Sequence, residues 1–542
     1  MTAADSTLEH EDAEDAPLLP DALHVRNHAS TIPIYQTRSR RIIILILFGV
    51  IFILAFGGTL MVVPSIQLYE DIVCHHYYNG LKGEKHKGYD DTIEEGLCKV
   101  REVQGELNIL FAGMQFLGGF ISLLTAVPFG LLADRIGRRP VFLLAIYGLF
   151  LANLWSLVVL KFWRYLPIRL LWLNTAFTLM GGGEAVVTMM FYAIGSDVTP
   201  QERRANVFLV GGGMVLFGEI LAPSISSYLM AKSPWIPLLI GQVLIGLGPA
   251  LFIFVPETLH MRPRGIESET LTPDAISERS VSINGGDKVG FFSTAISKAR
   301  NSLKELYGSL SVLHSLPILL LLLAFLIQPF SRQSVDLSVR YISNRFHWDL
   351  KNVGFLLSLR ALVNFLLLLA LLPSLSYYLI RRLHFSPKEK DLALARFSVV
   401  FLVIGALLIG LSPTIVGTIF GNVVFTLGTG TNALTRSLIT SLVDQEHVGR
   451  LYAAIGVVEV CGSLAASPTL AALYTLGLGL GGPWVGLPFF ALALICFVGA
   501  IGIWSFGCLA RDKLPSGVQD EDDANTLVVL PESAEGRSIN VV

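Results

Sequence analysis

Long runs of apolar residues alternate with short polar segments along most of this chain of 542 residues. A helix needs about 20 mostly apolar residues to cross the hydrocarbon core of a bilayer, and about twelve runs reach that length. We expect membrane spans at 42–64, 107–131, 141–160, 168–194, 207–230, 236–255, 317–341, 353–380, 392–411, 414–442, 451–476 and 487–504. The pattern therefore predicts an all-α integral membrane protein.

A polar segment at 256–315 separates the first six spans from the last six. Its serine- and threonine-rich sequence is typical of a linker rather than of a packed domain. The predicted organisation is a cytosolic tail (1–41), a six-helix bundle (42–255) that includes a long external loop (65–106), a cytosolic linker (256–315), a second six-helix bundle (316–510) and a second cytosolic tail (511–542).

Basic residues collect in the loops that follow even-numbered spans. Short cytosolic loops are enriched in lysine and arginine, so these loops belong to the cytosolic side. The loops after the ninth and the eleventh span carry no charge, as expected of the opposite side. Both termini are therefore predicted to be cytosolic, which also requires an even number of spans. Arg38, Arg40 and Arg41 precede the first span, and the basic loops contain Arg135, Arg138, Arg139, Arg203, Arg204, Arg381, Arg382, Lys388 and Lys390.

Composition supports a membrane protein and excludes other classes. The chain is 53% hydrophobic and 15% charged, whereas soluble proteins have about 25% charged residues. The net charge of −2 gives no basis for nucleic-acid binding. The sequence contains no nucleotide-binding loop, metal motif or nucleophile elbow. We therefore expect neither an enzyme nor a bound cofactor or metal.

The segment GLLADRIGRRP, residues 130–140, places one acid, three arginines and two glycines after the second span. A merely positive cytosolic loop would explain the arginines but not the acid and the glycines at these spacings. The segment resembles the loop signature G-x-L-A-D-R-x-G-R-R/K of the major facilitator superfamily, in which this loop latches one half of the protein to the other in the outward-open state. The resemblance assigns the latch role to Gly130, Asp134, Arg135, Gly137, Arg138 and Arg139.

Three of these positions also have a direct physical interpretation. Gly130 would allow the second span to approach a neighbouring helix closely. Gly137 would permit the tight turn between two helices. Asp134 would pair with a nearby arginine or face a helix N-terminus.

The layout of six plus six spans extends the resemblance over most of the chain. The segments QLYEDIVC (67–74), REVQGELNIL (101–110) and KDLALARFS (390–398) resemble fungal members of the drug- or metabolite–proton antiporter type. The resemblance implies a monomeric, proton-coupled transporter that moves a small organic solute across a lipid bilayer by alternating access. Export of a metabolite or xenobiotic is the preferred direction. A proton-symporting importer of a nutrient or cofactor, and a non-transporting membrane sensor, remain as alternatives.

The fifth span carries the segment GEILAPSISS, residues 218–227, in which Gly218 and Pro223 match defined positions of a family signature. It resembles the antiporter signature G-x-x-x-G-P-x-x-G-G, although other residues replace several of the glycines. In drug–proton antiporters this segment is thought to limit leak. The alternative is plain helix packing around small residues and a bend near the proline.

Charged residues inside the spans are the candidates for proton coupling and solute binding. Placing a charge in the hydrocarbon core costs free energy, so such residues are usually functional. Glu184 and Glu219 are the preferred proton sites, with a buried, hydrogen-bonded carboxyl as the alternative. Arg332, Asp336 and Arg340 are spaced four apart on one helix face, so Asp336 is expected to pair with either arginine or to lock the bundle. The set of candidates is Glu184, Glu219, Arg332, Asp336, Arg360, Arg436 and Glu459, with Gln115, Tyr192, Asn364 and Asn432 as weaker cavity-lining residues.

Two further features lie outside the spans. Cys74 and Cys98 both fall in the predicted external loop, where an oxidising exterior favours a disulfide. In the N-terminal tail, Glu14 with Leu18 and Leu19 fits the acidic dileucine pattern that sorts cargo to vacuoles or endosomes. We therefore expect either the plasma membrane or a vacuolar or endosomal membrane, with a solvated acidic tail as the alternative interpretation.

Overall fold

The computed structural model describes residues 39–82, 93–259, 321–322, 324–440 and 448–511. This part of the chain is helical and contains no β-strand. Ten of its helices are long and apolar enough to cross a membrane. The sorting residues Glu14, Leu18 and Leu19, most of the predicted linker and nearly all of both predicted tails lie outside the described residues.

The N-terminal half holds the first six predicted spans. Its elements are α1 (Arg40–Lys82), η1 (Glu95–Lys99), α2 (Arg101–Ile136), α3 (Arg138–Lys161), η2 (Ile168–Leu173), α4 (Asn174–Gly181), α5 (Gly183–Val198), α6 (Gln201–Met230) and α7 (Trp235–Phe252).

The C-terminal half holds the last six. Its elements are α11 (Ile327–Phe346), α12 (Leu350–Leu366), the π-helical turn η6 (Leu367–Leu371), α13 (Leu372–Leu383), α14 (Pro387–Leu411), α15 (Ile415–Leu427), α16 (Thr431–Thr440), α17 (Val448–Leu480), η8 (Gly482–Gly486) and α18 (Leu487–Arg511).

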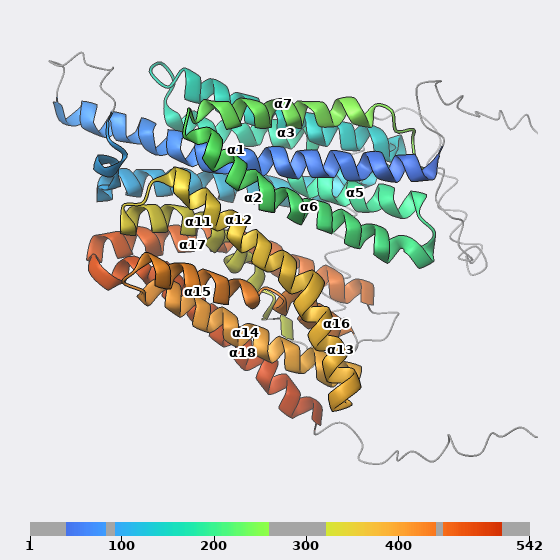
Figure 1. Cartoon of the computed structure of the whole chain (residues 1–542). Coiled ribbons are helices and arrows are strands. Elements are labelled where there is room, and N and C mark those ends of the chain that lie inside the picture. The colour runs from blue at the N-terminus through green and yellow to red at the C-terminus, as the bar shows by residue number, and fades with distance from the viewer. Residues whose placement is uncertain (1–38, 83–92, 260–320, 323, 441–447, 512–542) are drawn as a thin grey trace, which may run out of the picture.

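The two halves lie side by side and are joined mainly where α6 packs on α12 and α2 packs on α17. Figure 1 shows them close together at the end that carries η1 and the turn from α11 to α12. They diverge toward the opposite end, where the described chain begins at α1 and finishes at α18. We call the first the disulfide end, after the Cys74–Cys98 bond beside η1, and the second the motif end, after the segment 130–140.

The two predicted spans that are not among the ten differ from them for clear reasons, charge in one and a helix break in the other. The seventh, 317–341, corresponds in its described part to α11 and the residues just before it, and α11 carries four charged residues within the helix: Arg332, Asp336, Arg340 and Arg345. The tenth, 414–442, is divided into α15 and α16 by a break at 428–430.

Much of the predicted loop at 65–106 is helical rather than irregular. α1 does not stop at the end of its apolar run but continues to Lys82, and α2 already begins at Arg101. The extension remains helical because it keeps an apolar face, on which Ile66, Tyr69 and Ile72 are buried. Polar residues on the other face made this helical segment look like a loop.

Helix breaks occur at the same ordinal position in both halves. In the fourth span, Gly182 and Gly183 adopt positive φ angles of 80° and 66° between α4 and α5. In the tenth span, Gly428 lies so close to α14 that a Cβ would come within 2.5 Å of the Ser398 carbonyl oxygen. Interrupted helices in corresponding positions of two repeats are typical of a transport site between them.

Candidate transport site between the two halves

Charged side chains from both halves meet near the middle of the spans. Arg332 of α11 donates a hydrogen bond to Glu184, at the start of α5, with an N–O distance of 3.1 Å. Their side chains are 77% and 74% exposed. Charges at this depth are too costly to face lipid, so these side chains line water-accessible space between the halves.

Asp336 lies one turn further along α11 and has a different partner. Gln115 of α2 donates to its carboxylate at 2.9 Å. The expected pairing of Asp336 with Arg332 or Arg340 is wrong as a direct contact, because each arginine is engaged by the other half. Arg340 is 5% exposed, donates to Asn108 at 2.9 Å and lies 4.4 Å from the centre of the Phe111 ring. Three residues on one face of α11 therefore contact three different groups of the N-terminal half.

Glu219 of α6 completes this central cluster. It is half-buried, and Arg360 of α12 and Arg332 are the cations that attract it, whereas Glu184 repels it. The central cluster thus consists of three acids and three arginines contributed by both halves. Its members are Glu184, Glu219, Asp336, Arg332, Arg340 and Arg360.

The two remaining charged candidates form a pair within one half. Arg436 of α16 donates to Glu459 of α17 at 2.5 Å, and its guanidinium lies 5.9 Å from the Phe325 ring centre. This pair holds α16 against α17, so it does not bridge the two halves.

The weaker candidates fall into different places. Asn432 lines a small pocket beside the break in the tenth span, together with Gln328, Ser331, Thr431 and Thr435. Asn364 accepts a hydrogen bond from Thr429 at that break. Tyr192 is 45% exposed and contacts the Phe208 ring of α6.

The segment 218–227 packs α6 between two neighbours. A Cβ at Gly218 would come within 3.1 Å of the Phe56 backbone in α1. On the other side, a Cβ at Gly354 of α12 would lie 3.0 Å from the Pro223 carbonyl oxygen. The Ser224 N–H also donates to Ser358 across the two halves at 3.0 Å. Small residues here permit close helix contact, as in other membrane helix pairs.

The segment 130–140 forms the turn between α2 and α3, with Gly137 at φ 108°. Asp134 pairs with Arg138 at 2.8 Å, and Arg138 reaches Asp197 of α5 at 3.5 Å. Both ion pairs lie inside the N-terminal half. The expected close approach at Gly130 is absent, because a Cβ there would meet Met189 only at an ordinary 3.7 Å.

Glu257 is a partner of this segment that the sequence did not reveal. Its carboxylate accepts hydrogen bonds from the backbone N–H groups of Arg138 at 2.8 Å and Arg139 at 3.1 Å. It thereby caps the N-terminus of α3, where unpaired N–H groups favour an anion. The only sequence signal was an acid just after the sixth span, in PETL.

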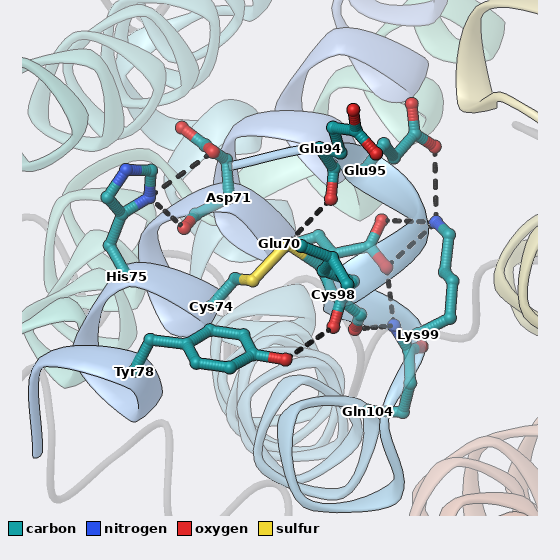
Figure 2. Close-up of a disulfide and its surroundings, with 11 residues drawn as sticks. Glu70, Asp71, Cys74, His75, Tyr78, Glu94, Glu95, Cys98, Lys99 and Gln104 are labelled. Carbon is teal, nitrogen blue, oxygen red and sulfur yellow. Dashed lines mark hydrogen bonds and ion pairs between the residues drawn. A yellow bond between two sulfur atoms is a disulfide. The ribbon is translucent and has the colours of Figure 1, made fainter. Parts of the chain in front are cut away.

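At the disulfide end, Cys74 of α1 is bonded to Cys98 of η1 (Figure 2). The adjacent Lys99 donates to Glu70 at 2.8 Å and to Ser343 of the C-terminal half at 2.8 Å. Asn108 of α2 donates to the Thr475 hydroxyl of α17 at 2.9 Å. Glu70, Lys99 and Asn108 were not among the candidates, because their partners lie far away in the sequence.

The sequence pattern that describes the Major Facilitator Superfamily matches residues 102–467. The chain belongs to this superfamily. It is therefore a multi-pass membrane transporter and not an enzyme.

Relatives and solved structures agree with this assignment. The chain is 32% identical over 514 residues to the MFS efflux pump atnC of Emericella nidulans, which covers 94% of each chain. It is 28% identical to the efflux pump ustT of Aspergillus flavus over 87% of this chain and 90% of that one. A crystal structure of a D-xylose–proton symporter superposes with a TM-score of 0.57 at 12% identity, covering 86% of this chain and 98% of that one, and it supports the fold alone.

Within this superfamily fold, nine hydrogen bonds join described residues of the two halves. They run from the middle of the spans to the disulfide end. The nine pairs are Lys99–Ser343, Lys99–Asn344, Glu95–Leu350, Asn108–Arg340, Asn108–Ala471, Asn108–Thr475, Gln115–Asp336, Glu184–Arg332 and Ser224–Ser358.

Proposed function

We propose that this transporter exports a small organic solute in exchange for protons, by alternating access between its two halves. The observation that carries the proposal is the central cluster, in which the Glu184 carboxylate and its partner Arg332 belong to different halves. Protonating Glu184 removes the charge that attracts Arg332, so proton binding changes the interaction between the halves. A proton site of this kind couples ionisation to conformation.

The proposed direction is antiport. A solute that offers a cation or a hydrogen-bond donor to Glu184 or Glu219 competes with the proton for the same carboxylate. Solute and proton then bind in turn, as exchange requires. Export is also supported by the relatives, since two of them are named efflux pumps.

We further propose that the motif end faces the cytosol, as the basic loops indicate. The nine hydrogen bonds between the halves then describe a conformation closed on the outside. Gly130, Asp134, Arg135, Gly137, Arg138 and Arg139 would act in the opposite conformation, as the motif end closes. The tight packing around Gly218 and Pro223 would keep protons from leaking between α6 and its neighbours α1 and α12.

The pocket that Asn432 lines has room for about one water molecule in this conformation, and it is proposed to hold a water or a single polar group of the solute. Thr435 is 2% exposed, yet its hydroxyl has no hydrogen-bond partner in the described protein, and neither does the Asn432 side-chain oxygen. A buried polar group without a partner is unfavourable, so a hydroxyl or amide of the solute, or a water, would satisfy it.

The test is untargeted mass spectrometry of cells and medium, comparing a strain that lacks the protein with one that expresses it from a controlled promoter. An exporter leaves a compound inside the deletion strain, and expression releases it into the medium. An importer leaves a compound in the medium of the deletion strain, which would overturn the antiport proposal.

A second stage uses inside-out vesicles and the compound so found. An imposed pH gradient should drive its uptake into the vesicles, and a proton ionophore should abolish that uptake. Uptake that the ionophore leaves unchanged would exclude proton coupling but would remain consistent with the proposal of export.

A further inference from the structure

The turn η1 contacts both halves of the transporter at the disulfide end. It follows α1 in the chain and is separated from α2 by Val100 alone, so it belongs to the N-terminal half. Three of its hydrogen bonds, however, reach the C-terminal half, at the last turn of α11 and the first residue of α12, on either side of the turn between these helices. Figure 2 shows its acidic and basic side chains gathered around the disulfide.

On the N-terminal side, the turn is fixed to α1 by a covalent bond and by polar contacts. The disulfide holds Cys98, the residue just before Lys99, and both cysteines are buried. The Tyr78 hydroxyl donates to the Leu97 carbonyl oxygen at 3.1 Å. Gln104 of α2 donates to the Cys98 carbonyl oxygen at 3.2 Å and also to Glu70. The position of η1 is thus set by α1 and α2 without help from the other half.

On the C-terminal side, η1 supplies one donor and two acceptors. Lys99 donates to the Ser343 hydroxyl at 2.8 Å, and its carbonyl oxygen accepts from the Asn344 side chain at 3.1 Å. Glu95 accepts from the Leu350 N–H at 3.0 Å, at the N-terminus of α12. That N–H is one of those that a helix leaves unpaired, so a carboxylate is a suitable partner.

Lys99 is shared between the two sides. Its ammonium also donates to Glu70 at 2.8 Å and to Glu95 at 3.1 Å, and its side chain is 3% exposed. When the halves separate at this end, Lys99 keeps Glu70 but loses Ser343, and Glu95 loses the helix end. Glu70 and Glu95 therefore remain acceptors for the Lys99 ammonium in both conformations. Because Lys99 is never left without a hydrogen-bond partner, its bond to the C-terminal half can break and re-form.

We propose that η1 is the outer gate of this transporter: the disulfide fixes it to α1, and Lys99 and Glu95 lock it reversibly onto the turn between α11 and α12. The gate adds a positioning role for Lys99, Glu95 and the disulfide to the proposed transport cycle, and it rests on the alternating access proposed above. It acts on the balance between conformations and touches neither the solute nor the proton sites.

The test measures distances at both ends by electron paramagnetic resonance on spin-labelled protein in lipid nanodiscs. One pair of labels, at Tyr165→Cys and Thr414→Cys, reports the disulfide end. A second pair, at Arg203→Cys and Lys388→Cys, reports the motif end. The remaining cysteines, Cys461, Cys496 and Cys508, are first replaced by serine or alanine.

Lys99→Met is expected to raise the population with a long distance at the disulfide end about fivefold, as for the loss of one or two hydrogen bonds. The same variant should raise the population with a short distance at the motif end. The double variant Cys74→Ala, Cys98→Ala is expected to act in the same direction. Lys351→Met is the matched control, because Lys351 pairs with Asp349 in its own half at the same end and is 47% exposed.

Two results would overturn the gate. Unchanged distances in Lys99→Met would show that η1 does not hold this end closed. Longer distances at both ends would show that the variant loosens the protein instead of shifting its conformation. The measurement needs no solute, so a failed gate leaves the export test untouched, and a failed export test leaves the gate measurable.

Discussion

The two ends of the interface between the halves are built differently. At the disulfide end, buried polar residues such as Lys99 and Asn108 bond across the halves, and Val63, Ile66 and Met230 join the apolar core of the C-terminal half. At the motif end, Asp134, Arg138 and Glu257 bond to partners in the N-terminal half. The disulfide end is thus held together by contacts between the two halves, whereas the contacts at the motif end lie within the N-terminal half.

The difference indicates how the same chain can adopt a second conformation. The motif end keeps its shape while the halves are apart, because Gly137 and Glu257 fix the turn independently of the other half. The central cluster lies between the two ends and is the part that responds to protons in our proposal. The following changes act on the centre, on the motif end, on the disulfide end and finally on the motif end again, in order of decreasing expected effect.

The largest effect is expected at the centre, from Glu184→Gln or Glu219→Gln. A glutamine side chain cannot bind and release a proton as a carboxylate does. Solute uptake into inside-out vesicles should therefore fall to the level seen with a proton ionophore. Glu106→Gln is the control, because Glu106 is an exposed acid that pairs with Arg169 at the disulfide end. Normal gradient dependence in both central variants would remove these residues as proton sites.

At the motif end, Gly137→Ala should destabilise the folded protein. The residue has a φ angle of 108°, and a Cβ would lie only 2.5 Å from the carboxyl carbon of Glu257. A strained backbone of this kind costs about 1–3 kcal/mol, to which the collision adds. We expect a melting temperature several degrees lower in detergent.

Gly130→Ala is the matched control for that experiment. Its Cβ would make an ordinary contact of 3.7 Å with Met189, so the melting temperature should stay close to that of the wild type. Equal losses in both variants would mean that the positive φ angle and Glu257 have no special effect at Gly137.

At the disulfide end, Asn108→Leu should weaken the closed interface by about 1–3 kcal/mol, because it leaves buried Arg340 without its acceptor. Thr418→Val is a suitable control, since among the described residues this buried hydroxyl donates only to the Thr414 carbonyl oxygen one turn earlier. The distance between spin labels at Tyr165→Cys and Thr414→Cys measures the opening. Equal distance distributions in Asn108→Leu and the wild-type background would contradict the role of Asn108.

The smallest effect on stability is expected from Asp134→Asn. The Asp134 side chain is 59% exposed in its pair with Arg138, and exposed pairs contribute about 0–1 kcal/mol. Transport should nevertheless fall, because the motif residues are proposed to act when the motif end closes, while solute binding stays close to normal. Wild-type turnover in this variant would refute the latch assignment.

The sequence predicted the features that depend on local pattern. Apolar runs located the spans, and the spacing in 130–140 identified a glycine turn, because both signals lie within a few residues. The partners of Glu184, Lys99 and Glu257 depend on contacts between residues 148, 244 and 119 positions apart, which one sequence does not reveal. Asp336 shows the limit well: its spacing favoured a partner on its own helix, and the tertiary structure supplied Gln115 instead.

The most direct test of alternating access compares hydrogen exchange in the wild type and in the double variant Glu184→Gln, Glu219→Gln, which imitates the protonated cluster. Peptides covering 95–108 and 340–350 report the disulfide end, and peptides covering 130–140 and 253–259 report the motif end. Our account predicts that exchange changes in opposite directions at the two ends. Changes in the same direction at both ends, or no change at either, would contradict it.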